Sequence, residues 1–430
     1  MKNEEVKNMR GWFKFAAAVI ATVLIAGCVQ PGEKAPTKTE VEVPLGVMMD
    51  LSGPLTTHGE DIKNTVTIAA EDINKKFEKD GKPYRVKLYV EDTKADPKIA
   101  LDTIMALQTQ GVKLIVGPQS SGEVKNIIGY VGSNKIIVAS PSSTAETKYL
   151  GVTAPDEKKY VFRFVPTDSF QTKAIAKLAH ELGVKAVVIT YIGNAWGKGL
   201  EEFGKAEFQK QGIEVKNSVE YPDPTPADFT PYIVTIEGNV NDLKKNYTKD
   251  QIAVVAFSYE EIATMLAQTQ DNSVLLNVKW IGCDGITKSS KIVADVPGKA
   301  NKIKLYSTVS ETRGTKEFDD LNSTYHQRIG SSPMSYGLNA YDTTWILALS
   351  FAQVYDKQGK YNDDAIAEAV PKVAGEYSAG KYGIYPVSGE VKLNEYKDRI
   401  GLEYRIYAVS NGSWNERGAW KFATNEIKWS

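Results

Sequence analysis

The stretch GVKLIVGPQSSGEVK, residues 111–125, predicts a short buried strand that ends in a polar turn and leads into a helix. The strand is the apolar run Leu114–Val116, which the following Gly-Pro terminates. Ser120 and Ser121 stand where a helix N-cap belongs, and Glu123 follows in the first turn. Because a helix N-terminus presents unpaired N–H groups and a partial positive charge, this turn is suited to a small anion.

The same design returns in the next strand along the chain. Residues 135–139 (KIIVA) predict a strand, and the turn 140–144 (SPSST) follows it with Ser142 and Thr144. Two neighbouring parallel strands would bring both hydroxyl-rich turns to one edge of a sheet. In open α/β sheets this carboxyl edge is where ligands bind, so we expect the ligand there.

Strands and helices alternate along the chain in two separate series, which predicts an α/β fold with parallel, doubly wound sheets. At 430 residues the chain exceeds a single ordinary core, and two lobes are expected. The first series begins with the strand Val43–Met49. Asp168 and Gln171 have the spacing of a capping box before the next helix. The second series runs from the strand Ala186–Tyr191 to the short strand Lys279–Ile281.

A return segment follows the second series. It begins with Leu305–Val309 and continues in two helical stretches, Lys316–Arg328 and Leu338–Tyr355. These elements are too few to bury a core of their own. We therefore expect the two lobes to exchange chain rather than to follow one another in sequence.

Residues 1–28 have the pattern of a secretory signal, with basic residues before the apolar stretch Phe15–Ala26. The stretch is short for a membrane span. Its end, LIAGC, resembles a lipoprotein box, in which Cys28 becomes the lipidated first residue; an uncleaved N-terminal anchor is the alternative. Residues 29–43 are rich in Pro, Lys and Glu and predict a flexible tether. Both interpretations place the protein outside the cytoplasmic membrane, anchored to its outer face.

Composition argues against several classes of function. A net charge of −1 gives no support for nucleic-acid binding. With Cys28 lipidated, Cys283 has no disulfide partner. The sequence contains no nucleophile elbow, Walker motif or zinc-protease motif, and its three histidines are scattered, so we expect no catalytic residue, metal or cofactor. Sequons at Asn246, Asn322 and Asn411 leave glycosylation open.

Seven segments, in order, resemble the substrate-binding proteins of ABC importers for branched-chain amino acids, the leucine/isoleucine/valine-binding type. The resemblance covers residues 44–430. The segments are DLSGPL, VGPQSSGE, ASPSSTA, FRFVPTDSFQ, YIGNAWGKGLEEF, FSYEEIATMLAQ and WIGCDGI. No single segment is diagnostic, but their order behind a lipoprotein box is specific.

The resemblance implies a two-lobed type I periplasmic-binding-protein fold, with three hinge crossovers and the ligand in the cleft. Lobe 1 would comprise residues 44–166 and 310–402, and lobe 2 residues 167–309 and 403–430. The crossings are expected near Pro166, Val309 and Leu402. The implied function is a monomeric, lipid-anchored receptor that binds an amino acid, in first place Leu, Ile or Val, and delivers it to the membrane permease subunits of an ABC importer.

The resemblance also implies roles for particular residues. In the family, two turns hold the ligand carboxylate, a Tyr and an acidic residue hold the ammonium group, and a further set contacts the side chain. On this sequence these positions are Ser121, Ser142 and Thr144, with Gln119 and Ser120 beside them, for the carboxylate; Tyr259 and Asp284 for the ammonium; and His58 and Trp196 for the side chain. His58 replaces a more usual aromatic residue, which leaves an aromatic or polar ligand open.

The chemistry of these residue types suits a zwitterion. Hydroxyls and helix N–H groups satisfy a carboxylate without a buried cation, and a carboxylate with an aromatic ring suits an ammonium. Structural roles are the alternative, since Ser120 and Ser121 could serve only as N-caps and Asp284 only as a turn residue. A receptor for an amide, an aromatic or another small ligand, and a sensor that docks on a membrane receptor, are the alternative functions.

Overall fold

The computed structural model describes residues 40–311, 316–401 and 403–430. The predicted signal, Cys28 and most of the predicted tether lie outside these residues, as does the crossing expected at Leu402. The first strand begins at Val41, whose N–H donates to the carbonyl of Pro83, so it starts before the expected end of the tether at residue 43. Within the described ranges, no helix is long and apolar enough to cross a membrane.

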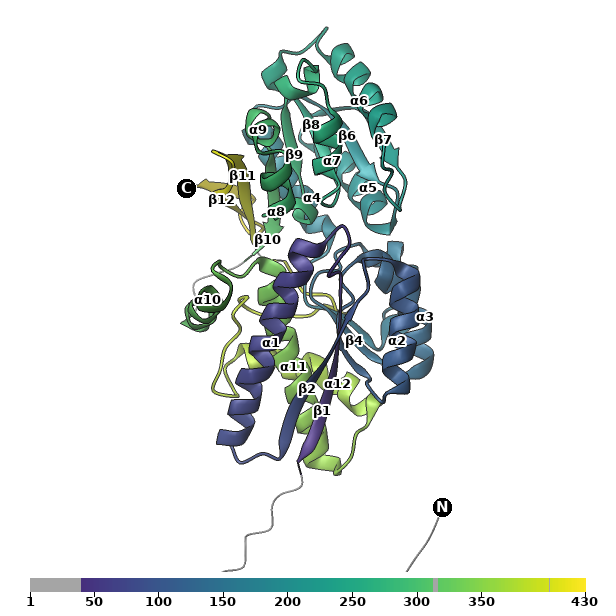
Figure 1. The fold of residues 1–430 in the computed structure, drawn as a ribbon, viewed down its shortest axis with the longest axis vertical. Helices are drawn as coiled ribbons and strands as arrows, with labels where there is room; N and C mark the ends of the chain where they lie inside the picture. Colours follow the sequence, from purple (N-terminus) through teal and green to yellow (C-terminus); the bar gives the residue numbers. More distant parts are fainter. Residues whose placement is uncertain (1–39, 312–315, 402) are drawn as a thin grey trace, which may run out of the picture. The chain divides into compact units, whose positions relative to one another are not determined.

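Five parallel strands form the sheet of the first lobe, in the order β2-β1-β3-β4-β5; Figure 1 labels β1, β2 and β4. They are β1 (Val41–Met49), β2 (Tyr84–Asp92), β3 (Leu114–Val116), β4 (Ile137–Ser140) and β5 (Val161–Arg163). Every residue of β3 and β4 is buried, as expected for central parallel strands covered by helices on both faces. The strand predicted in the opening stretch is therefore β3.

The sheet of the second lobe has the order β13-β12-β11-β10-β9-β8-β6-β7. Its strands are β6 (Ala186–Ile192), β7 (Glu214–Tyr221), β8 (Ile252–Phe257), β9 (Lys279–Gly282), β10 (Tyr306–Ser310), β11 (Glu403–Ser410), β12 (Ser413–Lys421) and β13 (Glu426–Trp429). Strands β6 to β10 run parallel, and β11 to β13 continue the sheet as an antiparallel meander.

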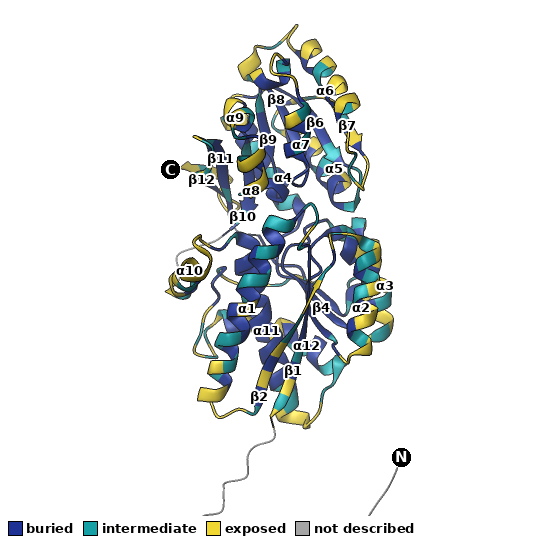
Figure 2. Ribbon diagram, in the orientation of Figure 1, coloured by how far each residue is buried: buried dark blue, intermediate teal, exposed yellow. Residues whose placement is uncertain are grey.

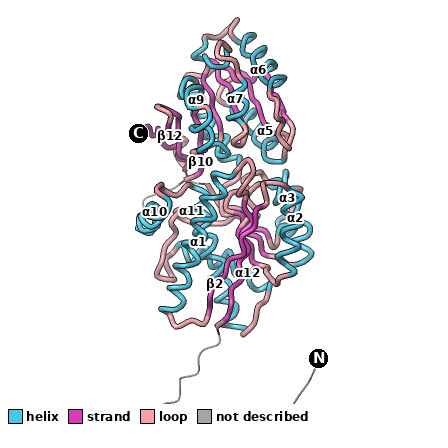
Figure 3. The backbone as a smooth tube through the Cα atoms, viewed as in Figure 1, coloured by secondary structure: helices cyan, strands magenta, loops and turns pink. Residues whose placement is uncertain are grey.

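Helices flank both sheets (Figure 3). The α-helices are α1 (Thr56–Lys79), α2 (Pro97–Thr109), α3 (Ser121–Asn134), α4 (Asp168–Glu181), α5 (Ala195–Lys210), α6 (Thr230–Leu243), α7 (Ile262–Gln268), α8 (Ser290–Asp295), α9 (Pro297–Lys302), α10 (Lys316–Ile329), α11 (Ser335–Gln358) and α12 (Asp363–Ser378). Short 3₁₀ turns are η1 (Thr147–Leu150), η2 (Pro155–Lys158), η3 (Lys249–Gln251), η4 (Val274–Asn277) and η5 (Asp284–Ile286).

The chain returns to the first lobe after β10. Helix α11 packs along α1 and against β3 and β4, although β10 belongs to the second sheet. Helix α11 is buried along most of its length (Figure 2), because it lies between α1, the first sheet and α12. The chain then rejoins the second sheet with β11. It thus passes between the lobes after β5, after β10 and before β11.

Candidate ligand-binding site

A small cavity lies where the carboxyl edge of the first sheet faces the second lobe. Its empty volume is about 290 Å³. Both lobes contribute to its wall, which consists of Leu55, Gln119, Ser120, Ser121, Ser142, Trp196, Tyr259, Asp284, Gly285 and Tyr336. Seven of the nine residues predicted from the sequence therefore lie at one cavity, and Thr144 and His58 do not line it.

The lobes touch across this cavity. The N–H of Glu260, which precedes α7, donates to the carbonyl of Pro54 at 3.3 Å. The hydroxyls of Thr57 on α1 and Ser290 on α8 are 2.9 Å apart. Because these contacts join opposite lobes, the structure describes an arrangement in which the lobes have closed on one another.

Helix α3 begins at the cavity as its sequence predicted. Ser120 is the N-cap, its hydroxyl accepts from the N–H of Glu123, and the Glu123 carboxylate accepts from the N–H of Ser120 at 2.7 Å. This capping box provides acceptors for the backbone N–H groups of Ser120 and Glu123. The N–H of Ser121, in the first turn, takes no part in the hydrogen bonds within the helix. The Ser121 hydroxyl accepts from the N–H of Ala145 at 3.1 Å and lies 3.0 Å from the Ser143 hydroxyl.

The turn after β4 is fixed by its own hydroxyls. The Ser140 hydroxyl accepts from the N–H of Ser143 at 3.0 Å and donates to the carbonyl of Pro118. Ser142 donates to the carbonyl of Gln119 at 2.9 Å, which ties this turn to the one before α3. The two hydroxyl-rich turns thus form one continuous wall without a charged side chain. We refer to this wall, Gln119–Ser121 with Ser140–Ala145, as the cradle.

The side-chain amide of Gln119 makes two hydrogen bonds that join the cradle to the neighbouring loop. Its Oε1 accepts from the N–H of Asp50 at 2.9 Å, and its Nε2 donates to the carbonyl of Leu55 at 3.1 Å. Gln119 therefore holds the loop between β1 and α1 against the cavity. One remaining amide hydrogen is left for a ligand.

Two stacked rings form the wall that the second lobe contributes. Trp196, in the first turn of α5, and Tyr259 have ring centroids 4.6 Å apart and planes at 18°. Both are buried, and Asn194 contacts the Tyr259 hydroxyl at 3.4 Å. Gly285 permits this packing, since a Cβ there would lie 2.9 Å from Trp196 and 2.5 Å from the carbonyl of Ser258.

Asp284 stands at the end of β9, buried in the same wall. Its Oδ2 accepts a hydrogen bond from the hydroxyl of Tyr336 in the first turn of α11, on the opposite lobe. Its Oδ1 has no hydrogen bond of normal geometry among the described residues, although the Gln171 side chain lies close enough to lower the pKa of Asp284. Burial raises the pKa of Asp284 above its usual range, and the bond from Tyr336 offsets only part of that rise.

Asp168 is a second buried carboxyl near Asp284, and its predicted role as a helix cap is wrong. Thr167 is the N-cap of α4 and Asp168 is already the first helical residue, with its N–H donating to the carbonyl of Thr144 at 2.9 Å. Neither carboxyl oxygen of Asp168 has a partner among the described residues. Burial and the neighbouring Asp284 raise the pKa of Asp168 well above its usual range.

The backbone around β10 brings these two carboxyls together. Gln171, one turn after Asp168, donates to the carbonyl of Thr308 at 2.8 Å. Thr287, three residues after Asp284, donates to the same carbonyl at 3.3 Å. The start of α4 and the turn after β9 are therefore neighbours, and each contributes one carboxyl to the region beside the cavity.

Two predicted residues lie behind the cavity wall. Thr144 is buried beside Asp168, where its hydroxyl lies close enough to lower the pKa of that carboxyl but makes no hydrogen bond of normal geometry within the described ranges. His58 is buried on α1 with its ring 5.3 Å from that of Tyr336. Burial lowers the pKa of His58 to about 4, so the imidazole is neutral at physiological pH. His58 supports Tyr336 rather than lining the cavity.

Sequence reasoning missed three residues of the wall: Leu55, Gly285 and Tyr336. Leu55 and Gly285 lie inside DLSGPL and WIGCDGI, two of the segments that carried the family resemblance. Their place in these segments could have indicated that they line the cavity. Tyr336 lies in the return segment, which carries none of the seven segments. Nothing local in the sequence indicated that it would reach Asp284.

Comparisons with known proteins show the family and the fold. A family model described as the receptor family ligand binding region matches residues 61–412. The chain belongs to this receptor family. It is 42% identical to an uncharacterized protein of Methanocaldococcus jannaschii, over 97% of this chain and 99% of that protein. It is 25% identical to the Leu/Ile/Val-binding protein BraC3 of Rhizobium johnstonii, over 80% of this chain and 88% of that protein.

The fold is that of a solved leucine-binding protein, LivK of Thermotoga maritima. The TM-score is 0.72 at 20% identity, with 89% of this chain and 99% of the other covered. The type I periplasmic-binding-protein fold and the resemblance to substrate-binding proteins are thus confirmed. The family is a ligand-binding region and the relative BraC3 is named as a binding protein, which confirms a solute-binding receptor rather than an enzyme.

Proposed function

We propose that this protein is an extracytoplasmic receptor that binds an amino acid as its zwitterion between the two lobes and delivers it to an ABC importer. The observation that carries the proposal is the division of the cavity wall. Neutral donors of the cradle form one side, and Asp284 with the Trp196–Tyr259 stack forms the other.

The cradle would hold the carboxylate. Ser121 and Ser142 line the cavity, with the Ser142 proton already donated to the carbonyl of Gln119, and the N-terminus of α3 supplies first-turn N–H groups and its positive end. Thr144 would support this wall from behind, and Gln119 would fix the loop that covers it. Donors without net charge suit an anion that arrives with its own counter-charge.

Asp284 and Tyr259 would hold the ammonium. An ammonium buried between closed lobes without an acceptor is very costly, so an acceptor must face it. The unpartnered Oδ1 of Asp284 is such an acceptor, and the face of Tyr259 adds a cation–π contact. Binding the cation would lower the pKa of Asp284 again and keep it ionised.

The remaining wall would contact the ligand's side chain. Leu55, Trp196 and Tyr336 are buried and largely apolar, and no basic side chain lines the cavity within the described residues. An aliphatic side chain suits such a wall, and the relative BraC3 is named for Leu, Ile and Val. We therefore place branched-chain amino acids first. His58 acts on this region through Tyr336.

Closure would follow the hinge movement common in two-lobed receptors. The cradle belongs to one lobe and is held by its own hydrogen bonds, so it would receive the carboxylate first. Asp284 and Tyr259 would reach the ammonium when the second lobe closes. In this scheme the receptor is a monomer, anchored through Cys28 to the outer face of the cytoplasmic membrane, and its closed form docks on the permease.

The Asp168–Asp284 pair favours one alternative ligand class. Two buried carboxyls with raised pKa values can hold protons, and a protonated carboxyl donates to a neutral ligand. An amide or an aromatic acid without an ammonium group would then be accommodated. A sensor that docks on a membrane receptor would use the same cavity.

A ligand panel tests the proposal. Thermal shift and calorimetry would compare leucine, isoleucine, valine, phenylalanine, glutamine and glutamate with leucinamide, benzoate and glucose. We expect leucine at about 100 times its dissociation constant to stabilise the protein by about 2.7 kcal/mol. Stabilisation by benzoate or glucose without any by amino acids would contradict the assignment.

A further inference from the structure

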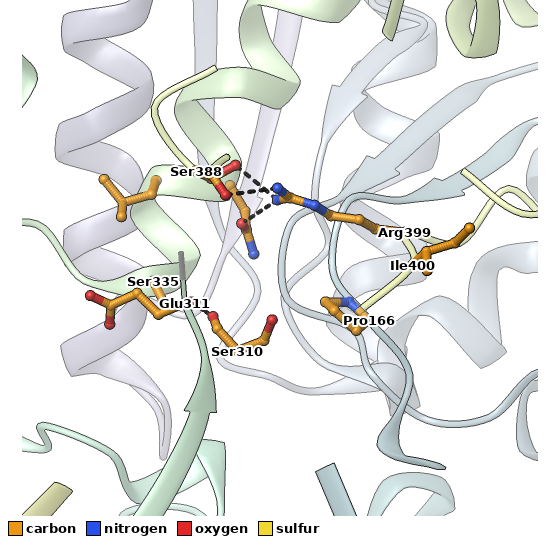
Figure 4. A pocket seen from close by; sticks show the side chains of 9 residues that line it. Pro166, Ser310, Glu311, Ser335, Ser388, Arg399 and Ile400 are labelled. Carbon is orange, nitrogen blue, oxygen red and sulfur yellow. Dashed lines mark hydrogen bonds between the residues drawn. The ribbon is translucent and has the colours of Figure 1, made fainter. Parts of the chain in front are cut away.

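The three passages between the lobes meet around a second cavity, which shows how the hinge is connected to the cradle. Its empty volume is about 310 Å³, and Pro166, Ser310 and Ile400 contribute one residue from each passage. The side chain of Arg399 extends across this cavity toward Ser388 (Figure 4). Arg399 directly precedes the third passage and is 7% exposed.

Arg399 reaches the cradle through one intermediate side chain. Its Nη1 donates to Oδ1 of Asn339 on α11 at 2.9 Å. The Nδ2 of the same amide donates to the carbonyl of Pro141 at 3.1 Å. The remaining guanidinium hydrogens bind the segment 388–390, at its three carbonyls and the Ser388 hydroxyl. Arg399 thus fixes the orientation of the Asn339 amide, and that amide fixes the carbonyl of Pro141 near the start of the turn.

The preceding residue, Asp398, reaches the other end of the same turn. Its carboxylate accepts from Nε and Nη2 of Arg163 at 2.7 and 2.6 Å, a bidentate pair that is fully buried. Nη1 of Arg163 donates to the carbonyls of Ser143 and Ala145. Arg163 and Lys158 hold the pKa of Asp398 below its usual range although burial alone would raise it. The carboxylate is therefore ionised and orients the guanidinium.

Both connections end on backbone carbonyls of the cradle. Holding the carbonyls of Pro141, Ser143 and Ala145 toward buried donors keeps these partial negative charges from the cavity. It also fixes the Ala145 N–H, which donates to the hydroxyl of Ser121. A site for an anion needs this arrangement, because a carbonyl turned into the cavity would repel a carboxylate.

We propose that Asp398 and Arg399 are positioning residues for the ligand carboxylate, the first acting through Arg163 and the second through Asn339. The proposal rests on the proposed function in that it takes the cradle as the carboxylate site. Its consequence is that the segment leading into the third passage sets the shape of the cradle, so hinge and ligand carboxylate share one hydrogen-bonded framework.

Two variants break the framework at the cradle end. Asn339→Asp keeps the acceptor for Arg399 but places an oxygen against the carbonyl of Pro141. Arg163→Lys keeps the charge beside Asp398 and loses the forked contact with the turn. In ligand-free protein, hydrogen exchange of the amides 142–145 should rise by about tenfold in either variant. The ratio of leucine to leucinamide affinity should fall by about tenfold.

Arg328→Lys is the matched control. Arg328 makes a similar forked contact with a carboxylate, that of Glu71 on α1, away from the turn. Unchanged exchange at 142–145 in both test variants, or an equal change in the control, would overturn the proposal. A wild-type protein that binds none of the amino acids would contradict only the proposed function, because the exchange measurement needs no ligand.

Discussion

The hydroxyl of Tyr336 donates a hydrogen bond to the carboxylate of Asp284 across the cavity, from α11 of one lobe to the end of β9 in the other. The two residues are brought together by the return of the chain to the first lobe. The bond can exist only when the lobes are closed. It therefore links the position of the lobes to the residue proposed to hold the ligand's ammonium.

Removing this hydroxyl should weaken ligand binding without unfolding the protein. Tyr336→Phe loses a charge-assisted hydrogen bond and keeps the ring that packs against His58. We expect leucine affinity by calorimetry to fall by about tenfold to a hundredfold. Tyr341→Phe is the control, since that hydroxyl binds Asp72 on the same lobe. Equal affinities in both variants would show that the cross-lobe bond does not assist closure.

Asp284→Asn should remove amino-acid binding in practice. The variant keeps the shape of the side chain but withdraws the charge that would face a buried ammonium, and such a loss typically costs about 3–5 kcal/mol, or at least about a hundredfold in affinity. Calorimetry measures it, and the melting temperature of the ligand-free variant should not fall. Asp295→Asn, an exposed change in the same lobe, is the control. Near-wild-type affinity in Asp284→Asn would mean that the ammonium is held elsewhere.

The local parts of the fold and site were predictable because they depend on neighbours in sequence. The strand Leu114–Val116 and the N-cap at Ser120 follow from an apolar run, a Gly-Pro stop and a Glu three residues after the cap. The family resemblance then placed Asp284 and Trp196 at the cavity.

Contacts between distant segments were not predictable in the same way. Tyr336 meets Asp284 only because the chain crosses the hinge again, and no spacing in the sequence records that. Asp168 has the spacing of a cap, but the helix begins one residue earlier than that spacing implies, with Thr167 as the N-cap, and the N–H of Asp168 bonds to the carbonyl of Thr144, which is distant in sequence. His58 was expected at the ligand and instead packs behind Tyr336.

Trp196→Ala should change the selectivity of the side-chain region. The indole stacks on Tyr259, and its removal leaves space in the cavity wall beside Gly285. Leucine affinity should fall by about tenfold or more as apolar contact is lost, and phenylalanine should lose less because its ring can occupy the space. Competition binding of the two amino acids measures the ratio. Trp429→Ala, at a surface position of β13, should leave it unchanged.

Glu123→Gln should remove part of the pH dependence of stability. Burial raises the pKa of Glu123 from 4.5 to about 7. Since the folded-state value lies above the unfolded one, the folded protein binds this proton more tightly. The resulting stabilisation is present below about pH 4.5 and is lost as the pH rises through about 7. At pH 8 the wild-type protein therefore carries a buried charge that costs about 3 kcal/mol relative to acid conditions.

Glutamine keeps an oxygen for the N–H of Ser120 and cannot ionise. In thermal melts of ligand-free protein, the melting temperature of the variant relative to that of the wild type should therefore be higher at pH 8 than at pH 5. Glu157→Gln is the comparison: this exposed carboxyl has a lowered pKa, so it is ionised at both pH values, and its replacement should shift both melts alike. A difference between wild type and Glu123→Gln that does not grow from pH 5 to pH 8 would mean that Glu123 is ionised throughout, with a cation or water at the unpartnered oxygen of its carboxylate.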